Sequence, residues 1–167
     1  MRLIQKISIS RLCTIRMRQW KGRLHEIEIQ REKAGMRHPD IAELLREAMM
    51  LQVRVEERAL VPDLCGFYWD ENRTIMLNDC LPDWQYRCTL CHELVHAKHR
   101  DSGCGLAGAK GERRARKETA LRLVDPIEYA SAEATYDGDM FLIASELGVT
   151  VQVINDYRMW LDNNVRA

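Results

Sequence analysis

Hydrophobic positions in the first part of the chain predict one helix followed by a small sheet. The apolar residues after Pro39 recur with the period of a helix, which we place with the proline at its first position and Asp40 in its first turn. Residues 53–55 alternate apolar and charged side chains, as in a short strand. Two apolar runs, 66–69 and 74–77, flank a turn-rich tetrad and indicate a hairpin. The expected sheet is antiparallel and has about three strands.

The rest of the chain has the pattern of several helices. The period is helical over residues 82–99 and again over about 112–124. Between them, residues 101–111 are rich in glycine and predict a loop. Asp125 and Pro126 then start a further helix. The last predicted helices cover residues 139–147 and 150–161. We therefore expect a mostly helical α+β fold.

The helical phase of the segment that carries Cys88 and Cys91 assigns its inner face. Together with Trp84 and Val95, the two cysteines form the apolar stripe of a helix that faces the core. Cys88, Cys91 and His92 also spell the attachment motif of a c-type haem. That chemistry requires export and cysteines turned outward, and arginines interrupt the first 20 residues too often for a signal peptide. We therefore reject the haem interpretation.

A different motif overlaps it and favours a metal. His92 and His96 lie one turn apart on the flank of the apolar stripe, close enough for both imidazoles to bind one ion. Glu93 is offset by one residue, too far round the helix to be a ligand but well placed to touch a water on the metal. We predict that the two histidines bind a divalent metal and that Glu93 is the catalytic base.

A catalytic metal site usually has a third protein ligand, and four residues are candidates. They are His99, Asp101, Glu112 and Glu118. His99 lies at the helix end and is more typical of a rim residue. On the next helix, Glu112 heads a small apolar face that points inward, where an unpaired carboxylate would be unfavourable. We predict Glu112 as the third ligand and keep His99 and Glu118 as alternatives.

Composition adds the organisation of the chain. The 167 residues suit one domain, and the formal net charge is zero. Residues 1–37 nevertheless hold ten Lys or Arg against three Glu, so we expect a basic, partly helical or loosely ordered arm before a domain over residues 38–167. No apolar stretch is long enough to span a bilayer, and we expect a cytoplasmic protein with free thiols and no membrane partner.

The chain from Gly66 to Leu161 resembles the ImmA/IrrE metallopeptidases, especially their actinobacterial and phage-type branch. The resemblance is carried by the hairpin, by residues 87–97 with their His-Glu-x-x-His segment, by residues 112–115, and by residues 143–150. It implies a small gluzincin-like α+β core with zinc, or alternatively manganese, on His92, His96 and Glu112. It also implies Glu93 as the base and a helix-turn-helix repressor as the substrate, whose cleavage would derepress a mobile element or a stress response.

One position departs from the family pattern. Members usually carry Asp four residues after the ligand glutamate, where this chain has Arg116, which could pair with Glu112. Two other functions therefore stay open: a weakly active or inactive regulator that uses the metal as a structural staple to bind a repressor, and a nucleic-acid-binding module that uses the basic arm. For the peptidase, we expect the substrate to lie as an added strand along Thr74, Ile75, Met76 and Leu77.

Overall fold

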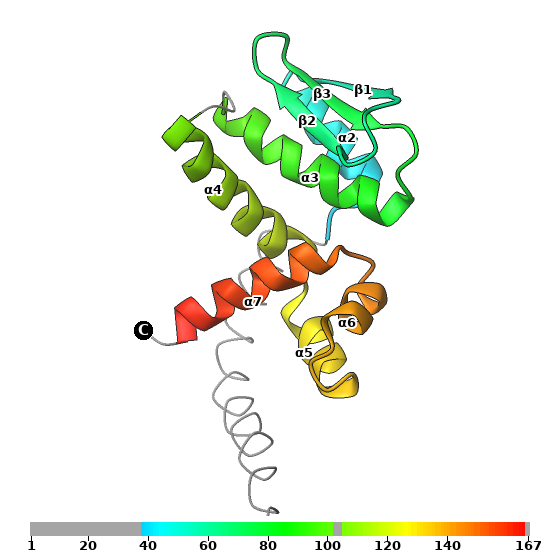
Figure 1. The fold of residues 1–167 in the computed structure, drawn as a ribbon, viewed down its shortest axis with the longest axis vertical. Helices are drawn as coiled ribbons and strands as arrows, with labels where there is room; N and C mark the ends of the chain where they lie inside the picture. The colour runs from blue at the N-terminus through cyan, green and yellow to red at the C-terminus, as the bar shows by residue number, and fades with distance from the viewer. Residues whose placement is uncertain (1–37, 102–104, 166–167) are drawn as a thin grey trace, which may run out of the picture. The chain divides into compact units, whose positions relative to one another are not determined.

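The computed structural model describes residues 38–101 and 105–165, in which a small sheet and a set of helices surround one core (Figure 1). The predicted basic arm over residues 1–37 lies outside this part of the chain. The strands are β1 (Arg54–Arg58), β2 (Gly66–Trp69) and β3 (Thr74–Asn78). The helices are α2 (Ile41–Met50), α3 (Asp83–His99), α4 (Gly105–Leu123), α5 (Pro126–Thr135), α6 (Met140–Glu146) and α7 (Val151–Val165). The expected mostly helical α+β class is confirmed.

The sheet is mixed rather than wholly antiparallel. Its strand order is β1-β3-β2, with β2 antiparallel to β3 as the hairpin pattern predicted, and β1 parallel to β3. The four residues Thr74–Leu77 lie in the central strand, and all four pair on both sides, with Arg54–Glu57 on one and Gly66–Trp69 on the other. The prediction that a substrate strand adds along Thr74, Ile75, Met76 and Leu77 is therefore wrong, because these residues have no open edge. Their continuous apolar run is typical of a buried central strand.

The start of α2 differs by two residues from the prediction, because the helix begins at Ile41 rather than Pro39. Asp40 is the N-cap rather than a residue of the first turn, and its Oδ1 accepts a hydrogen bond from the Glu43 N–H at 2.7 Å. The Glu43 carboxylate accepts in return from the Asp40 N–H at 3.0 Å, which completes a capping box. Pro39 therefore precedes the helix instead of beginning it.

Asp40→Ala should lower the free energy of unfolding by about 1 kcal/mol, because it removes the acceptor that satisfies a free N–H at the start of α2. Urea denaturation followed by circular dichroism would measure the change. Asp40→Asn keeps an acceptor of the same reach and should stay within a few tenths of a kcal/mol of the parent. An unchanged midpoint for Asp40→Ala would show that this cap does not contribute to stability.

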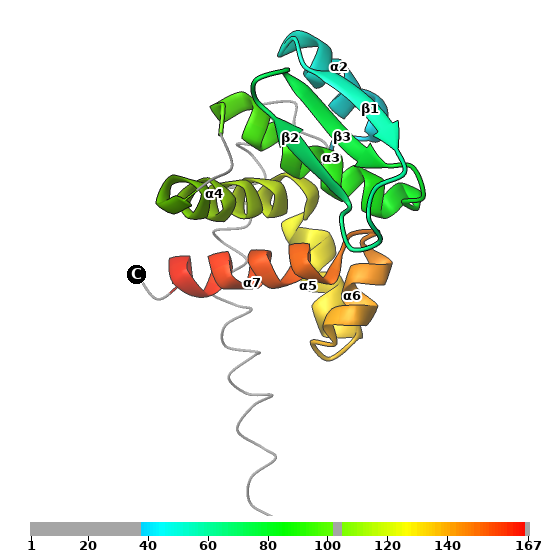
Figure 2. The ribbon, with the colours of Figure 1, turned by 45° about the horizontal axis from the view of Figure 1, so that its top comes forward.

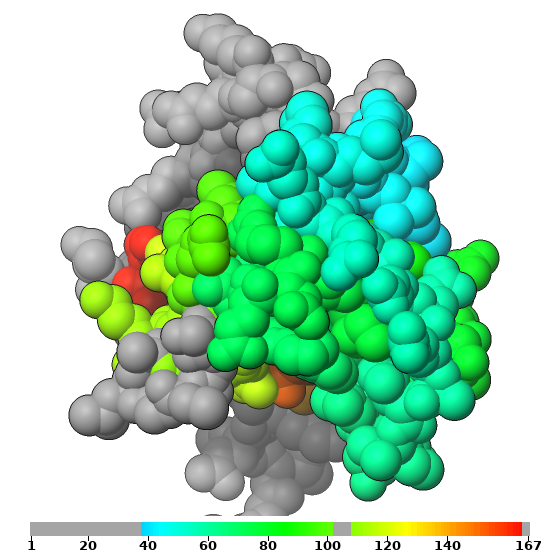
Figure 3. Space-filling view, turned by 90° about the horizontal axis from the view of Figure 1, so that it is seen from above, coloured from blue at the N-terminus to red at the C-terminus, as the bar shows by residue number. Residues whose placement is uncertain are grey.

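Helix α3 is the central element of the fold. It contacts α2, β2, β3 and α4. In Figure 1 it lies between the sheet and α4, and in Figure 2 it runs behind the sheet. Cys88, Cys91 and Val95 are buried as their helical phase predicted, and burial raises the pKa of the Cys91 thiol to about 12. Trp84 is 45% exposed, so the predicted stripe stops short of the first turn. Seen from above, α2 and β1 in cyan form the surface beside the green residues of the hairpin and α3 (Figure 3).

Helix α4 begins seven residues earlier than the sequence suggested. The predicted loop over 101–111 is wrong from Gly105 onward, because this segment is helical. Glycine favours loops mainly where φ is positive, and among the described residues the positive-φ glycines are Gly138 and Gly148. A glycine inside a helix costs only about 1 kcal/mol relative to alanine, which the packing of α4 against α3 and α7 can offset.

The C-terminal helices follow the sequence closely. Asp125 and Asp139 are the N-caps of α5 and α6, and the side chain of each accepts two backbone N–H bonds. Gly148, with φ of 58°, makes the turn between α6 and α7. Within residues 38–101 and 105–165, no helix combines the length and apolar character that crossing a bilayer requires.

Candidate metal centre

Three predicted ligands converge where α3 packs against α4. His92 and His96 extend from successive turns of α3, and their Nε2 atoms are 3.1 Å apart. Glu112 comes from α4, and its Oε2 lies 3.4 Å from each of these two nitrogens. In the described part of the chain, this is the group of three or more His, Cys, Asp or Glu side chains whose donor atoms come close enough to hold one ion.

The spacing of these donor atoms fits a tetrahedral ion. Ligand atoms about 2.0–2.1 Å from one zinc lie about 3.3–3.4 Å from one another in tetrahedral geometry. The separations among His92, His96 and Glu112 are 3.1, 3.4 and 3.4 Å. Two imidazoles and one carboxylate are also a donor set typical of zinc in hydrolases. The residues present therefore fit the metal that the sequence predicts.

Asp101 is close to this group but takes a different role from the one considered for it. Its Oδ2 lies 3.0 Å from His96 Nδ1, on the ring edge opposite the converging nitrogens, and its Oδ1 accepts from Arg114 at 2.5 Å. Partial burial works to raise the pKa of Asp101, but the hydrogen bonds from Arg114 and His96 hold it below its usual value. Asp101 therefore lies outside the convergent group of donor atoms and contacts His96 at its other ring nitrogen.

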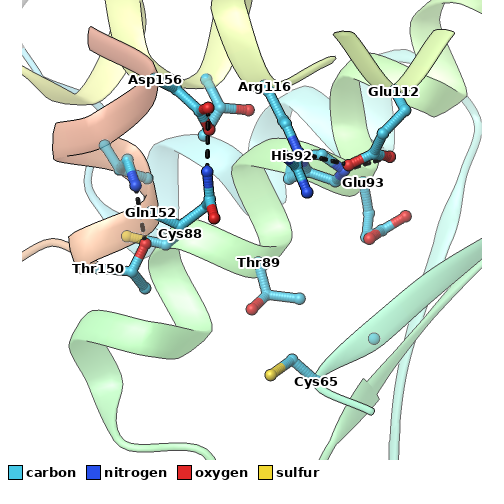
Figure 4. A pocket seen from close by; sticks show the side chains of 13 residues that line it. Cys65, Cys88, Thr89, His92, Glu93, Glu112, Arg116, Thr150, Gln152 and Asp156 are labelled. Carbon is cyan, nitrogen blue, oxygen red and sulfur yellow. Dashed lines mark hydrogen bonds and ion pairs between the residues drawn. The ribbon is translucent and has the colours of Figure 1, made fainter. Parts of the chain in front are cut away.

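Arg116 pairs with Glu112, as the spacing of four residues suggested. Its Nε donates to Glu112 Oε1 at 2.9 Å, whereas the other oxygen, Oε2, lies 3.4 Å from the Nε2 atoms of His92 and His96. Figure 4 shows Arg116 and His92 beside the Glu112 carboxylate. The hydrogen bond from His92, opposed by burial and assisted by Arg116, lowers the pKa of Glu112 to about 2. The arginine thus occupies one carboxylate oxygen and leaves the other for an ion.

Glu93 is buried beside the same group, with 7% of its surface exposed. Burial raises its pKa above the usual value, although the nearby His92 and His96 oppose this shift. Figure 4 shows its carboxylate between α3 and the strand that follows Cys65. A carboxylate with a raised pKa is a better proton acceptor near neutral pH than an exposed one, which suits the predicted role of a base.

The two alternative ligands lie elsewhere. His99 Nε2 is 3.2 Å from Glu118 Oε1, so these side chains pair with each other across the α3–α4 contact. Neither belongs to the convergent group of donor atoms. The structure therefore brings together His92, His96 and Glu112, and leaves out His99 and Glu118.

Sequence reasoning missed the opposite wall of the cleft. Helix α7 and the turn before it contribute Thr150, Gln152, Val153 and Asp156 to the pocket that contains His92 and Glu93. Gln152 donates to Asp156 at 3.0 Å, and burial raises the pKa of Asp156 (Figure 4). The only signal in the sequence is that Asp156 is an acidic residue next to the buried face of its helix. Nothing in the local sequence relates it to the His-Glu-x-x-His motif about sixty residues earlier.

Comparison with known proteins identifies the family. The family model described as the IrrE N-terminal-like domain, of peptidase family M78, matches residues 49–157. This range spans more than half of the chain and includes the converging residues and the cleft wall up to Asp156. No curated protein and no solved structure matches the chain.

Proposed function

The chain belongs to the IrrE N-terminal-like family of peptidases, and we propose that it is a zinc-dependent endopeptidase whose ion is held by His92, His96 and Glu112. The observation that carries this proposal is the convergence of three donor atoms at separations of 3.1 to 3.4 Å. Zinc suits this set of nitrogen and oxygen donors, and manganese is the alternative where more oxygen ligands are added.

The reaction would take place in the cleft lined by His92, Glu93 and Glu112. When bound, the ion would lower the pKa of a water toward about 7 and polarise the scissile carbonyl. Glu93, held next to the histidines by α3, would take the proton from that water and later deliver it to the leaving amine. Its burial keeps bulk water from screening the carboxylate and raises its proton affinity. Arg116 would hold Glu112 in place.

A peptide substrate has an open strand edge beside these residues. Strand β2 pairs with β3 on one side and has no strand on its other side within the described residues. Cys65 and Gly66, at its start, line the cleft with His92 and Glu93. We place the substrate backbone along β2, because strand addition fixes a peptide largely independently of its side chains. A Cβ at position 66 would lie 2.7 Å from the Leu77 side chain and 2.8 Å from the Met76 carbonyl, so glycine keeps this strand close to β3.

We further propose a helix-turn-helix repressor as the substrate, so that cleavage would derepress a mobile element or a stress response. This proposal rests on the family resemblance. The test is incubation of the zinc-loaded protein with repressors encoded near its gene, with and without a chelator. Chelator-sensitive cleavage supports the peptidase. Tight zinc binding without cleavage of any repressor, together with repressor binding, would favour the non-catalytic regulator.

Zinc affinity should depend on pH through the histidines. Burial lowers the pKa of His92, but the hydrogen bond that His92 donates to Glu112 and the charge of Glu93 outweigh it, so the net shift is upward. Protons therefore begin to compete with the metal at His92 at a pH above the ordinary histidine pKa of about 6.5. The affinity for zinc should fall as the pH drops from 7 to 5. Glu112, with a pKa of about 2, stays ionised in this range. Competition with a chromophoric chelator would measure the change, and a flat profile would contradict histidine ligation.

A further inference from the structure

Asp101 lies between Arg114 and His96 in a chain of hydrogen bonds, and none of the predicted site roles explains its place there. Arg114 Nη2 donates to Asp101 Oδ1 at 2.5 Å, and Asp101 Oδ2 lies 3.0 Å from His96 Nδ1. The Asp101 side chain is only 16% exposed. Since a carboxylate only accepts, His96 Nδ1 carries the hydrogen of this contact, and its Nε2 keeps its lone pair toward His92 and Glu112.

The end of α3 places Asp101 over His96 through the main chain as well. Arg100 adopts the left-handed conformation, with φ of 54° and ψ of 46°. This turn lets the Asp101 N–H donate to the His96 carbonyl at 3.1 Å and the Arg100 N–H to the Ala97 carbonyl at 3.4 Å, which is a Schellman motif. A residue without a Cβ would be favoured at position 100, but the Arg100 side chain pairs with Asp70 at 2.9 and 3.3 Å and so compensates.

Helix α4 leaves space for the Asp101 carboxylate at one position. A Cβ on Gly111 would lie 2.9 Å from Asp101 Oδ2, 3.0 Å from Cγ and 3.2 Å from Oδ1. Gly111 lies within the helix with ordinary helical backbone, so its conformation does not require glycine. What glycine provides here is room for the Asp101 carboxylate, which an added Cβ would displace.

We propose that Asp101 is a positioning residue for the metal centre. Its carboxylate holds His96 in the ligating orientation, and is itself held by the hydrogen bond from Arg114 in the space left by Gly111. This inference rests on the proposed function, because it concerns the metal that His92, His96 and Glu112 would bind. Removal of Asp101 would leave the ring of His96 free to rotate and its two nitrogens free to exchange the hydrogen. Arg114 and Gly111 both lie on α4, so they meet the Asp101 carboxylate only when the end of α3 and the middle of α4 are packed together.

The first test is zinc affinity of the full chain. Replacing a carboxylate that supports a ligating histidine typically weakens metal binding about 10- to 100-fold. Asp101→Ala should lie in that range, and Asp101→Asn should weaken binding less, because its amide oxygen still accepts from Nδ1. Asp63→Asn removes an exposed carboxylate from the loop before β2 and should bind as the parent does. Far-ultraviolet circular dichroism would check that each variant is folded.

Gly111→Ala gives a readout that a merely structural role would not produce. Alanine favours the helix, so the variant should unfold at the same or a higher temperature. Its methyl group would nevertheless push the carboxylate off His96, and zinc affinity should fall about 10-fold. In the Asp101→Ala background there is no carboxylate to push, and the same substitution should have no further effect on affinity.

The hydrogen on His96 Nδ1 provides a spectroscopic check. Nitrogen-15 spectra of the zinc-loaded parent should show it as a slowly exchanging signal, which Asp101→Ala should lose. Parent-like zinc affinity in Asp101→Ala, or an equal loss from Gly111→Ala in both backgrounds, would overturn the role of Asp101 and leave the proposed function standing. A parent protein that binds no zinc would overturn both.

Discussion

Glu93→Gln should abolish peptide cleavage by the zinc-loaded protein while its zinc content stays at the parent level. Glutamine has nearly the shape of glutamate but cannot take a proton from water. General acid and base catalysis by one positioned side chain contributes about 10²- to 10⁴-fold, and Glu93 would act in both directions. We therefore expect a loss of at least about 10³-fold in the rate of cleavage.

Zinc content should not change because Glu93 does not belong to the converging donor atoms. Burial already opposes its charge, so a neutral side chain at this position should not destabilise the fold. Glu118→Gln, on α4 and paired with His99, is the matched control and should cleave as the parent does. Elemental analysis beside a quenched cleavage assay would measure both quantities. Substantial turnover by Glu93→Gln would remove this residue from the base role.

Helical phase predicted the parts of the site that lie within one element. The inward direction of Cys88 and Cys91 fixed the flank on which His92 and His96 stand, and α3 has this arrangement. The same reasoning on the next helix separated Glu112 from Glu118 by the face that each shares. It succeeded although that helix begins at Gly105 instead of near Glu112, because helical phase does not depend on where a helix starts.

The features that the sequence did not predict depend on how the helices and strands pair with one another. Strand β3 is central because β1 joins it in parallel after a connection through β2, and alternation along a strand does not reveal its neighbours. The position of the Asp101 carboxylate depends on the left-handed backbone of Arg100 and on the missing Cβ of Gly111. These two local features act together only when α3 and α4 are packed against each other. Arg116 illustrates the converse, since its spacing predicted the pair with Glu112 but not that the pair leaves Oε2 facing the histidines.

Glu112→Ala should reduce zinc affinity by roughly two orders of magnitude. Structural zinc sites bind with about 10–16 kcal/mol shared by four ligands, so one ligand contributes about 3 kcal/mol, and each 1.4 kcal/mol is a factor of ten. Two histidines would still bind weakly, whereas cleavage should fall below detection at stoichiometric zinc. The variant also removes the carboxylate that Arg116 pairs with.

Glu118→Ala is the matched variant that distinguishes Glu112 from Glu118 as the third ligand, since both lie on α4. Glu118→Ala breaks the pair with His99 but leaves the converging atoms intact, so its zinc affinity should equal that of the parent. Thermal unfolding with and without zinc gives a second measure, because an ion that binds only the folded state stabilises it by RT ln(1 + [L]/Kd). Zinc should therefore raise the midpoint of the parent and of Glu118→Ala, and at the same concentration barely change that of Glu112→Ala. The reverse order would transfer the ligand role to Glu118 and require the α3–α4 contact to rearrange when the metal binds.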